Sequence, residues 1–241
     1  MISELRVGVE GGRVTELSIP PPLGAKVLAG RTGPTLVLVA TAAGLLEGDR
    51  LRVAVRVGAD QHLTVRSVAA QLAHPCPGGD RTGLEVTACV GPGGSLDWWP
   101  EPLVVCAGAH HVGTVRVDLG AGAEVRWVEE IVLGRWREDP RSATLRTSLR
   151  IDVARRPLLR DGLDTTLPGF AGLAVAGANR YLGAAVVAGA DRSAGDAVDR
   201  DEGPEWLELA GPGRLTRVLD VDCARGRSEL ARRIGCPATA R

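Results

Sequence analysis

Hydrophobic and polar residues alternate along several stretches of the chain, and these stretches resemble one another. Three of them are LRVAVRVGADQHLTV at 51–65, LEVTACVGPGGSLDW at 84–98 and GTVRVDLGAGAEVRW at 113–127. A period of two is typical of a β-strand that buries one face. A glycine at the same place in each stretch predicts a turn, because glycine enters turn conformations at little steric cost. Each stretch therefore predicts a strand, a turn and a second strand.

The three stretches align without gaps, which makes them a repeat with a defined register. Equivalent positions are Val53, Val86 and Val115; Val57, Val90 and Leu119; Gly58, Gly91 and Gly120; Leu63, Leu96 and Val125; and Val65, Trp98 and Trp127. A degenerate fourth copy with a shorter turn, SLRIDVARRPLL, lies at 148–159. Units about 30 residues apart are in the range where repeats stack on their neighbours, and one two-stranded unit cannot bury its apolar face alone.

The repeat therefore predicts an all-β fold, an elongated two-layer β-solenoid or sandwich-like domain, with a small number of helices near the C-terminus. The alternative is an ordinary antiparallel sandwich whose hairpins look alike by chance. We expect a single domain over residues 1–241, with the repeat-bearing β core at about 36–165 and an α/β segment at about 166–241. In that segment, 170–190 predicts a helix followed by a strand, 191–204 predicts a loop, and 227–234 predicts a helix capped by Gly235.

Composition and charge narrow the function classes. Lys+Arg and Asp+Glu number 29 each, so the basic excess of a nucleic-acid binder is missing. No apolar run reaches the roughly 18 residues of a membrane span, and no signal-peptide pattern opens the chain. The five cysteines have irregular spacing, which favours a reducing, cytoplasmic compartment. We expect a cytoplasmic protein that binds neither nucleic acid nor membrane.

Motifs for catalysis are weak in this chain. The sequence contains no GxxxxGK[ST] and no GxSxG, and the glycine-rich stretch at Gly120 falls in a turn of the repeat rather than before a helix. His110 and His111 are adjacent, so they should point to opposite faces of a strand. His74 and Cys76 offer an imidazole and a thiolate to a soft metal, although a surface loop between strands is the favoured interpretation.

Four short segments resemble the UreD/UreH family of urease accessory proteins. They are AGLLEGD at 43–49, LDWWPE at 96–101, VEEIVLGR at 128–135 and RPLLRD at 156–161. They occur in the family's order over roughly residues 40 to 165. The family is similar to an elongated β protein with two sheet layers, which agrees with the fold predicted from the repeat.

The resemblance implies a function in urease maturation and no enzyme activity. It implies a scaffold or metallochaperone that binds the urease apoprotein together with UreF-like and UreG-like accessory proteins. It also implies an internal tunnel for nickel, which would be in transit rather than a tightly bound cofactor. The family's tunnel acids fall on Asp49, Glu129 and Asp161 in this sequence.

Each acid also has an ordinary structural interpretation. Glu129 lies two residues beyond Trp127, so both should share the apolar face of a strand, where a carboxylate needs a partner or water. Its alternative role is an ion pair with an arginine such as Arg135. Asp49 would close a Gly-Asp turn, and Asp161 would be a loop acid. The tunnel hypothesis predicts that the three acids border one connected polar cavity across the β core.

Two other functions remain open from the sequence. One is a structural interaction domain that never meets metal. The other is a β-solenoid hydrolase that uses Asp/Glu pairs for acid-base chemistry. The adjacent Glu129 and Glu130 should face opposite sides of their strand, so they cannot form such a pair.

Overall fold

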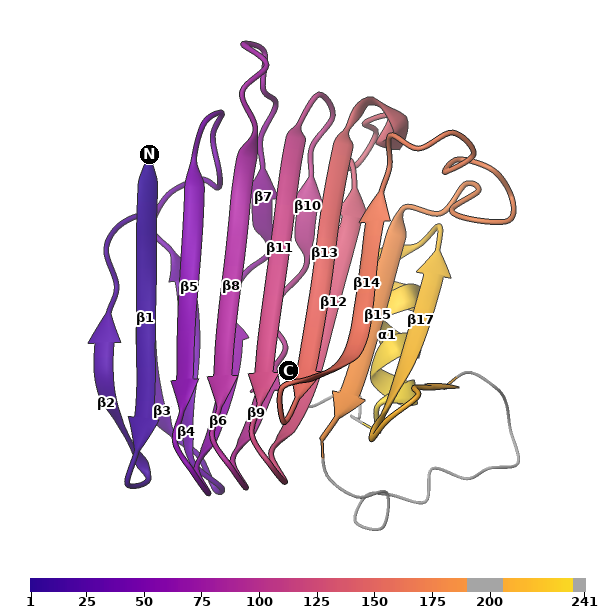
Figure 1. Cartoon of the computed structure of the whole chain (residues 1–241). Coiled ribbons are helices and arrows are strands. Elements are labelled where there is room, and N and C mark those ends of the chain that lie inside the picture. The colour runs from indigo at the N-terminus through magenta and orange to yellow at the C-terminus, as the bar shows by residue number, and fades with distance from the viewer. Residues whose placement is uncertain (190–205, 236–241) are drawn as a thin grey trace.

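The structure, a computed structural model, describes residues 1–189 and 206–235 and is dominated by β-strands (Figure 1). Its elements are β1 (Ile2–Glu10), β2 (Arg13–Ser18), β3 (Leu23–Ala29), β4 (Pro34–Ala40), β5 (Arg50–Val57), β6 (His62–Ser67), β7 (Gln71–Ala73), β8 (Thr82–Val90), β9 (Ser95–Trp98), β10 (Leu103–Val105), β11 (His110–Leu119), β12 (Glu124–Leu133), the 3-10 helix η1 (Pro140–Ser142), β13 (Thr144–Val153), β14 (Arg156–Asp164), β15 (Tyr181–Ala188), β16 (Leu207–Glu208), β17 (Gly213–Asp220) and α1 (Cys223–Arg233).

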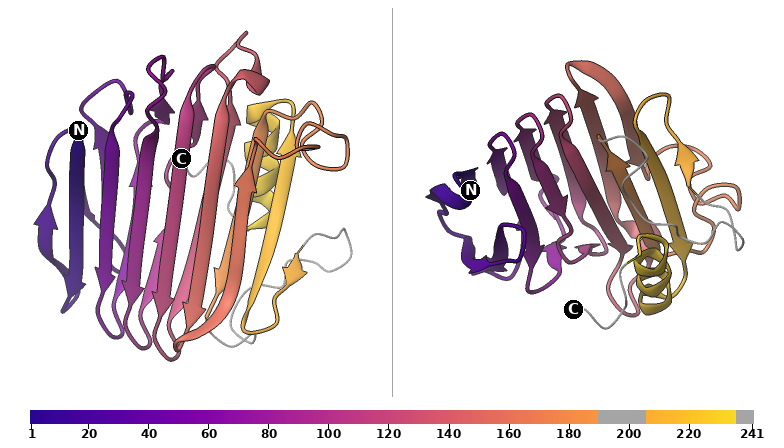
Figure 2. Two further views of the ribbon diagram at one scale, coloured as in Figure 1. Left: turned by 45° about the horizontal axis from the view of Figure 1, so that its top comes forward. Right: turned by 90° about the horizontal axis from the view of Figure 1, so that it is seen from below.

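The strands form two facing sheets, which the view along the strands separates clearly (Figure 2, right). Sheet A has the order β14-β13-β11-β8-β5-β1-β2 within the described residues. Sheet B has the order β16-β17-β15-β12-β9-β6-β4-β3, and β10 and β7 extend it beside β12. Both sheets bury one face, so the predicted two-layer all-β architecture is confirmed.

The register predicted from the repeat is also confirmed. In sheet A, parallel pairing aligns Val53 with Val86 and Val86 with Val115. In sheet B, parallel pairing aligns Leu63 with Leu96 and Leu96 with Val125. The two strands of each unit lie in different sheets, so the units are stacked arches rather than hydrogen-bonded hairpins. The predicted stacking of the units is therefore confirmed, and the ordinary antiparallel sandwich is not the fold.

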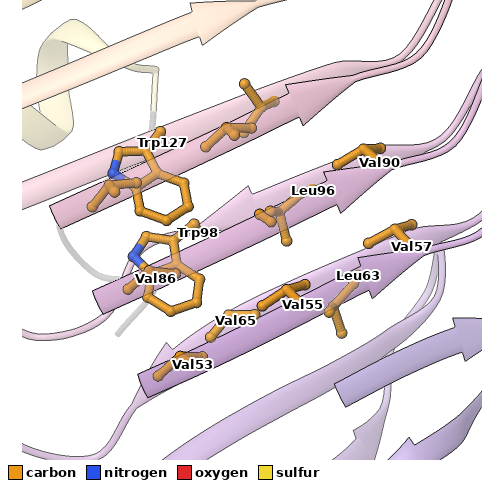
Figure 3. Close-up of a cluster of buried hydrophobic side chains, with 14 of the residues drawn as sticks. Val53, Val55, Val57, Leu63, Val65, Val86, Val90, Leu96, Trp98 and Trp127 are labelled. Carbon is orange, nitrogen blue, oxygen red and sulfur yellow. The ribbon is translucent and has the colours of Figure 1, made fainter. Parts of the chain in front are cut away.

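Inward-facing valines, leucines and two tryptophans fill the space between the sheets (Figure 3). Trp98 and Trp127 occupy the same position of successive units and stack with ring centroids 4.7 Å apart and planes 3° from parallel. Offset or stacked aromatic pairs add about 0.5–1.5 kcal/mol beyond their area burial. The repeat thus places its largest side chains in one column of the core.

The fourth copy follows the repeat only in its first half. β13 pairs in parallel with β11, as the repeat predicts, but β14 turns back and pairs antiparallel with β13 in the same sheet. Two residues, Ala154 and Arg155, connect these strands, and both have positive φ (46° and 65°). Such primed two-residue turns favour hairpins, and they are too short to cross the ~10 Å between packed sheets. Antiparallel β15 continues sheet B instead.

The C-terminal part differs from its prediction in one respect. The helix expected in 170–190 is wrong, because turns occupy this stretch up to the strand β15. Gly169 and Gly177 have positive φ (86° and 56°), which an α-helix does not accommodate. The predicted loop at 191–204 lies outside the described residues. α1 confirms the predicted C-terminal helix, and Gly235 follows it with φ 69° as a C-cap glycine does.

α1 packs on the outer face of sheet B, against β15 and β17 (Figure 1). Leu230 and Ala231 of the helix join a small buried cluster with Tyr181, Ala185 and Val218. Among the described residues, no helix is both long and apolar enough to cross a lipid bilayer.

Candidate functional site

A cavity of about 140 Å³ lies between the sheets, beyond the Trp98–Trp127 stack. Sheet A contributes residues of β5, β8, β11 and β13 to its wall, and sheet B contributes residues from β3 to β12. Most of the wall is aliphatic or aromatic, and the polar residues that line it are Ser67, Gln71, Glu101, His111, Thr114, Glu129, Glu130, Thr147 and Ser148. The cavity is large enough for several water molecules and runs across the stacked units.

The cavity exists because the repeat loses a large side chain in its third unit. Leu51 and Leu84 occupy one column of sheet A, and Gly113 is the next residue in that column. Inward-facing Val115 is two residues beyond Gly113 on β11, so both lie on the same face. The missing side chain leaves open space on the core side. Sequence reasoning missed this residue, although the break in the leucine column is visible in the alignment of the repeats.

Glu129 enters the cavity from β12, as its position after Trp127 predicts. Trp127 Nε1 donates a hydrogen bond to Glu129 Oε1 at 3.1 Å. Burial raises the pKa of Glu129 to about 7, the indole hydrogen bond opposes that rise, and the nearby charge of Asp161 adds to it. The alternative ion pair with Arg135 is wrong, because Arg135 pairs with Glu138 instead.

Asp161 lies beside Glu129 but is not part of the cavity wall. It sits within β14 rather than in a loop, and its carboxylate forms an ion pair with Arg217 of β17. In sheet B, Glu129 aligns with Ala184, which aligns with Arg217, so the arginine and the glutamate share a row. The Asp161–Arg217 pair therefore joins the two sheets at their C-terminal edge, close to Glu129.

Asp49 lies away from both groups. Its carboxylate accepts hydrogen bonds from the amino terminus of Met1 (2.8 Å) and from the backbone N–H of Leu46 (3.0 Å). This is the Gly-Asp turn that the sequence offered as the alternative. The prediction that all three acids border one polar cavity is therefore wrong: Glu129 lines it, while Asp49 and Asp161 are engaged by cations outside its wall.

His111 is a polar group on the cavity wall that sequence reasoning noticed without assigning a role. The predicted opposite orientations of His110 and His111 are confirmed, since His111 is 2% exposed and His110 is half-buried. Thr82 Oγ1 lies 2.8 Å from His111 Nδ1. His111 Nε2 is buried and has no hydrogen-bond partner among the described residues. Burial lowers the pKa of His111 to about 4, so the imidazole is neutral at pH 7.

Glu130 faces the opposite side of β12 and belongs to a different site. It accepts a hydrogen bond from Trp99 Nε1 at 2.7 Å and forms an ion pair with Arg227 Nε of α1 at 2.8 Å. It is buried beneath the helix. The sheet separates its carboxylate from that of Glu129, as the sequence predicts, so the two do not act as an acid-base pair.

His74 and Cys76 follow β7 in a loop, as predicted, and each has a structural partner. His74 Nε2 lies 2.9 Å from the carbonyl oxygen of Ala43, and buried Cys76 directs its thiol toward the carbonyl oxygen of His74 at 3.5 Å. Within residues 1–189 and 206–235, no three His, Cys, Asp or Glu side chains are grouped to hold a metal ion.

Comparisons with known proteins agree on one family. The family model described as UreD urease accessory protein matches residues 22–233. The chain is 37% identical to urease accessory protein UreD of Parafrankia sp., covering 94% of this chain and 84% of that protein. It is 41% identical to urease accessory protein UreD of Frankia alni, covering 90% and 81%, and 36% identical to the protein of that name from Frankia casuarinae, covering 93% and 78%. The match spans both sheets and α1, and the chain therefore belongs to the UreD family of urease accessory proteins.

Proposed function

We propose that the protein acts in urease maturation as a scaffold that binds apo-urease with UreF-like and UreG-like partners and passes Ni²⁺ through its interior. It catalyses no reaction of its own in this proposal. The observation that carries it is Glu129, a carboxyl group that projects into a cavity of a predominantly apolar core. Such a group is costly to bury, so its presence favours a use for its charge.

The chemistry of Glu129 suits brief contact with Ni²⁺. Nickel is a borderline cation that binds carboxylate oxygen as well as imidazole nitrogen. A carboxyl group whose pKa is raised to about 7 is partly protonated near neutral pH. The metal must displace that proton to bind, which weakens the complex. Weak sites in series allow an ion to move on, whereas a tight site would trap it.

Asp161 would be the next oxygen ligand on such a route. Asp161 lies close enough for its charge to raise the pKa of Glu129. In the absence of metal, Arg217 neutralises the charge of Asp161. A cation that reached this edge of the sandwich could displace the guanidinium of Arg217 and bind the carboxylate of Asp161 in its place. Asp49 has no comparable support, because its carboxylate holds the amino terminus and a turn. Its part in the route rests on the family resemblance alone.

Partner binding is supported by apolar side chains left in water. Trp136 is 85% exposed and Leu173 is 98% exposed. They lie on two loops held together by Arg180, which follows the second loop and donates hydrogen bonds to the carbonyl oxygens of Leu133, Arg135 and Glu138 beside the first. Exposed apolar side chains that gather on neighbouring loops are a feature of surfaces that meet another protein.

The decisive variant for the proposal is Glu129→Ala, with Glu129→Gln as its isosteric companion. Both remove the ligand charge without disturbing an ion pair, because the hydrogen-bond partner of Glu129 is the indole of Trp127. We expect urease activity and bound nickel per active site to fall several-fold in cells grown at limiting nickel. The deficit should shrink when excess Ni²⁺ is supplied, since mass action restores occupancy of a weakened site.

Glu124→Gln is the matched control. Glu124 begins the same strand but is exposed, so its loss should leave activation unchanged. Each variant is also tested for co-purification with apo-urease, which separates scaffold function from nickel transfer. Full activation by Glu129→Ala at limiting nickel would contradict the nickel route and leave a scaffold without a metal role.

A further inference from the structure

The buried imidazole of His111 is a polar group that the fold itself leaves unexplained. Its Nε2 is buried without a hydrogen-bond partner among the described residues. Leaving such an atom unsatisfied costs free energy, because the desolvation of a polar group is then not compensated. An apolar residue of similar size in this position would avoid that cost. A partner from within the cavity, a water molecule or an ion, would satisfy this nitrogen.

His111 Nε2 lies near the space over Gly113. A methyl group placed on Gly113 would lie 3.9 Å from this nitrogen and 3.4 Å from Thr147 Cγ2. His111, Gly113 and Glu129 all line the same cavity. The cavity thus has an imidazole ring on its sheet A side and a carboxyl group on its sheet B side.

Thr82 holds the ring in the form that a metal requires. The hydroxyl of Thr82 lies 3.4 Å from the carbonyl oxygen of His110, to which it donates its proton. In the Nδ1-protonated tautomer of the neutral ring, this hydroxyl then accepts the proton of His111 Nδ1 at 2.8 Å. This leaves a lone pair on Nε2. Histidines that bind metals generally donate their other ring N–H to an oxygen in this way.

We propose that His111 Nε2 is a ligand for a divalent transition-metal ion inside the cavity, so that the interior offers a nitrogen donor in addition to the oxygen of Glu129. The ion class follows from the donor, since imidazole suits Ni²⁺, Cu²⁺ and Zn²⁺ and not Mg²⁺ or Ca²⁺. For Ni²⁺ this inference rests on the proposed function, and it assigns the route its nitrogen ligand.

The test uses the whole purified chain, Ni²⁺ alone as the probe and His111→Asn as the variant. Asparagine places its amide nitrogen near the position of Nδ1, so the contact with Thr82 can persist while Nε2 is lost. Paramagnetic Ni²⁺ broadens the proton signals of a ring that binds it, and the chain has only four histidines to distinguish. We expect the ring signals of His111 to broaden at substoichiometric Ni²⁺, and Mg²⁺ to leave them unchanged.

His62 and His110 supply internal controls. Both ring nitrogens of His62 contact side-chain hydroxyls, at 2.7 and 3.0 Å, so its signals should change last. His110→Asn alters the neighbouring ring on the opposite face and should leave the response of His111 unchanged. His111→Asn should raise the Kd for Ni²⁺ about tenfold or more, with thermal unfolding close to that of the unaltered chain.

The outcomes separate this inference from the proposed function. If Ni²⁺ leaves the His111 signals sharp, or His111→Asn binds nickel as tightly as the unaltered chain, His111 is not a ligand, even where Glu129→Ala still impairs activation. If the signals broaden and the variant loses affinity, the ligand assignment is supported. Full activation by Glu129→Ala in that case would overturn the nickel route while leaving the metal site in place.

Discussion

Two neighbouring glutamates on β12 show how much the surroundings of a side chain decide its role. Glu129 faces the cavity, accepts one hydrogen bond from Trp127 and has a pKa raised to about 7. Glu130 faces α1 and is held by Arg227 and Trp99. Period-two alternation predicts their opposite directions from the sequence alone. It does not predict the partners of Glu130, because Trp99 and Arg227 lie 31 and 97 positions away from it in the chain.

The raised pKa of Glu129 makes its contribution to stability depend on pH. Below its ordinary value of 4.5 the carboxyl is protonated in both the folded and the unfolded chain, so burial has no charge penalty. Between 4.5 and about 7 the unfolded chain loses the proton first, and stability falls as pH rises. Above about 7 the full penalty applies, which is on the order of 3 kcal/mol.

Glu129→Gln should therefore raise the free energy of unfolding by up to about 3 kcal/mol at pH 8 and by little at pH 5. Urea unfolding of the variant and the unaltered chain at the two pH values measures this difference. Glu124→Gln, on the exposed start of the same strand, should show no such pH dependence. An equal effect of Glu129→Gln at both pH values would mean that its carboxyl titrates normally.

At the scale of elements, the repeat was predictable because its signals are local. Alternation defines the strands, and Gly58, Gly91 and Gly120 mark the arches that carry the chain from one sheet to the other. The fold of the fourth copy was not predictable in this way. Its two-residue turn converts an arch into a hairpin, and β15 then takes the place in sheet B that the repeat left vacant.

The helix α1 depends on a buried charge that the sheet supplies. Glu130→Ala would leave Arg227 and Trp99 without this carboxylate beneath the helix. Removing one partner of a buried ion pair costs about 3–5 kcal/mol. Arg227 keeps its second ion pair, with Glu101 at 2.7 Å, so we expect a loss at the low end of this range in the free energy of unfolding, with faster amide hydrogen exchange over Cys223–Arg233.

The matched comparison for Glu130→Ala is the double variant Glu130→Ala/Arg227→Ala. The double variant removes the whole interaction between the two side chains, so it should be less destabilised than the sum of the single changes. Glu129→Ala, one residue away, should not weaken α1. If Glu130→Ala leaves the exchange of the helix unchanged, the ion pair does not hold it.

At the scale of the whole molecule, the stack of arches builds a continuous core with a gap in its side-chain columns at Gly113. Inward placement of Glu129 could be predicted, since it follows from the strand period. The engagement of Asp49 and Asp161 could not, because Met1 and Arg217 meet them only through the three-dimensional arrangement of the sheets. The role of Gly113 was predictable only in part. The break in the repeat is visible in the sequence, but whether it opens a cavity depends on the side chains of the facing sheet.

Restoring the repeat at Gly113 tests the central claim that the interior is a route for nickel. Gly113→Leu returns the residue found at Leu51 and Leu84, and its Cβ has room beside Thr147. The new side chain fills cavity space without changing any charge. Stability should therefore be retained or increased by cavity filling. Val112→Leu, the adjacent residue on the outer face, adds bulk outside the cavity and serves as control.

The measurement is nickel bound per urease active site in cells grown at limiting nickel, with each variant present at normal abundance and co-purifying with apo-urease. The account predicts that Gly113→Leu lowers nickel incorporation several-fold while Val112→Leu does not. Nickel incorporation at the unaltered level in a folded, urease-bound Gly113→Leu protein would contradict it, because the metal would then reach urease without crossing this cavity.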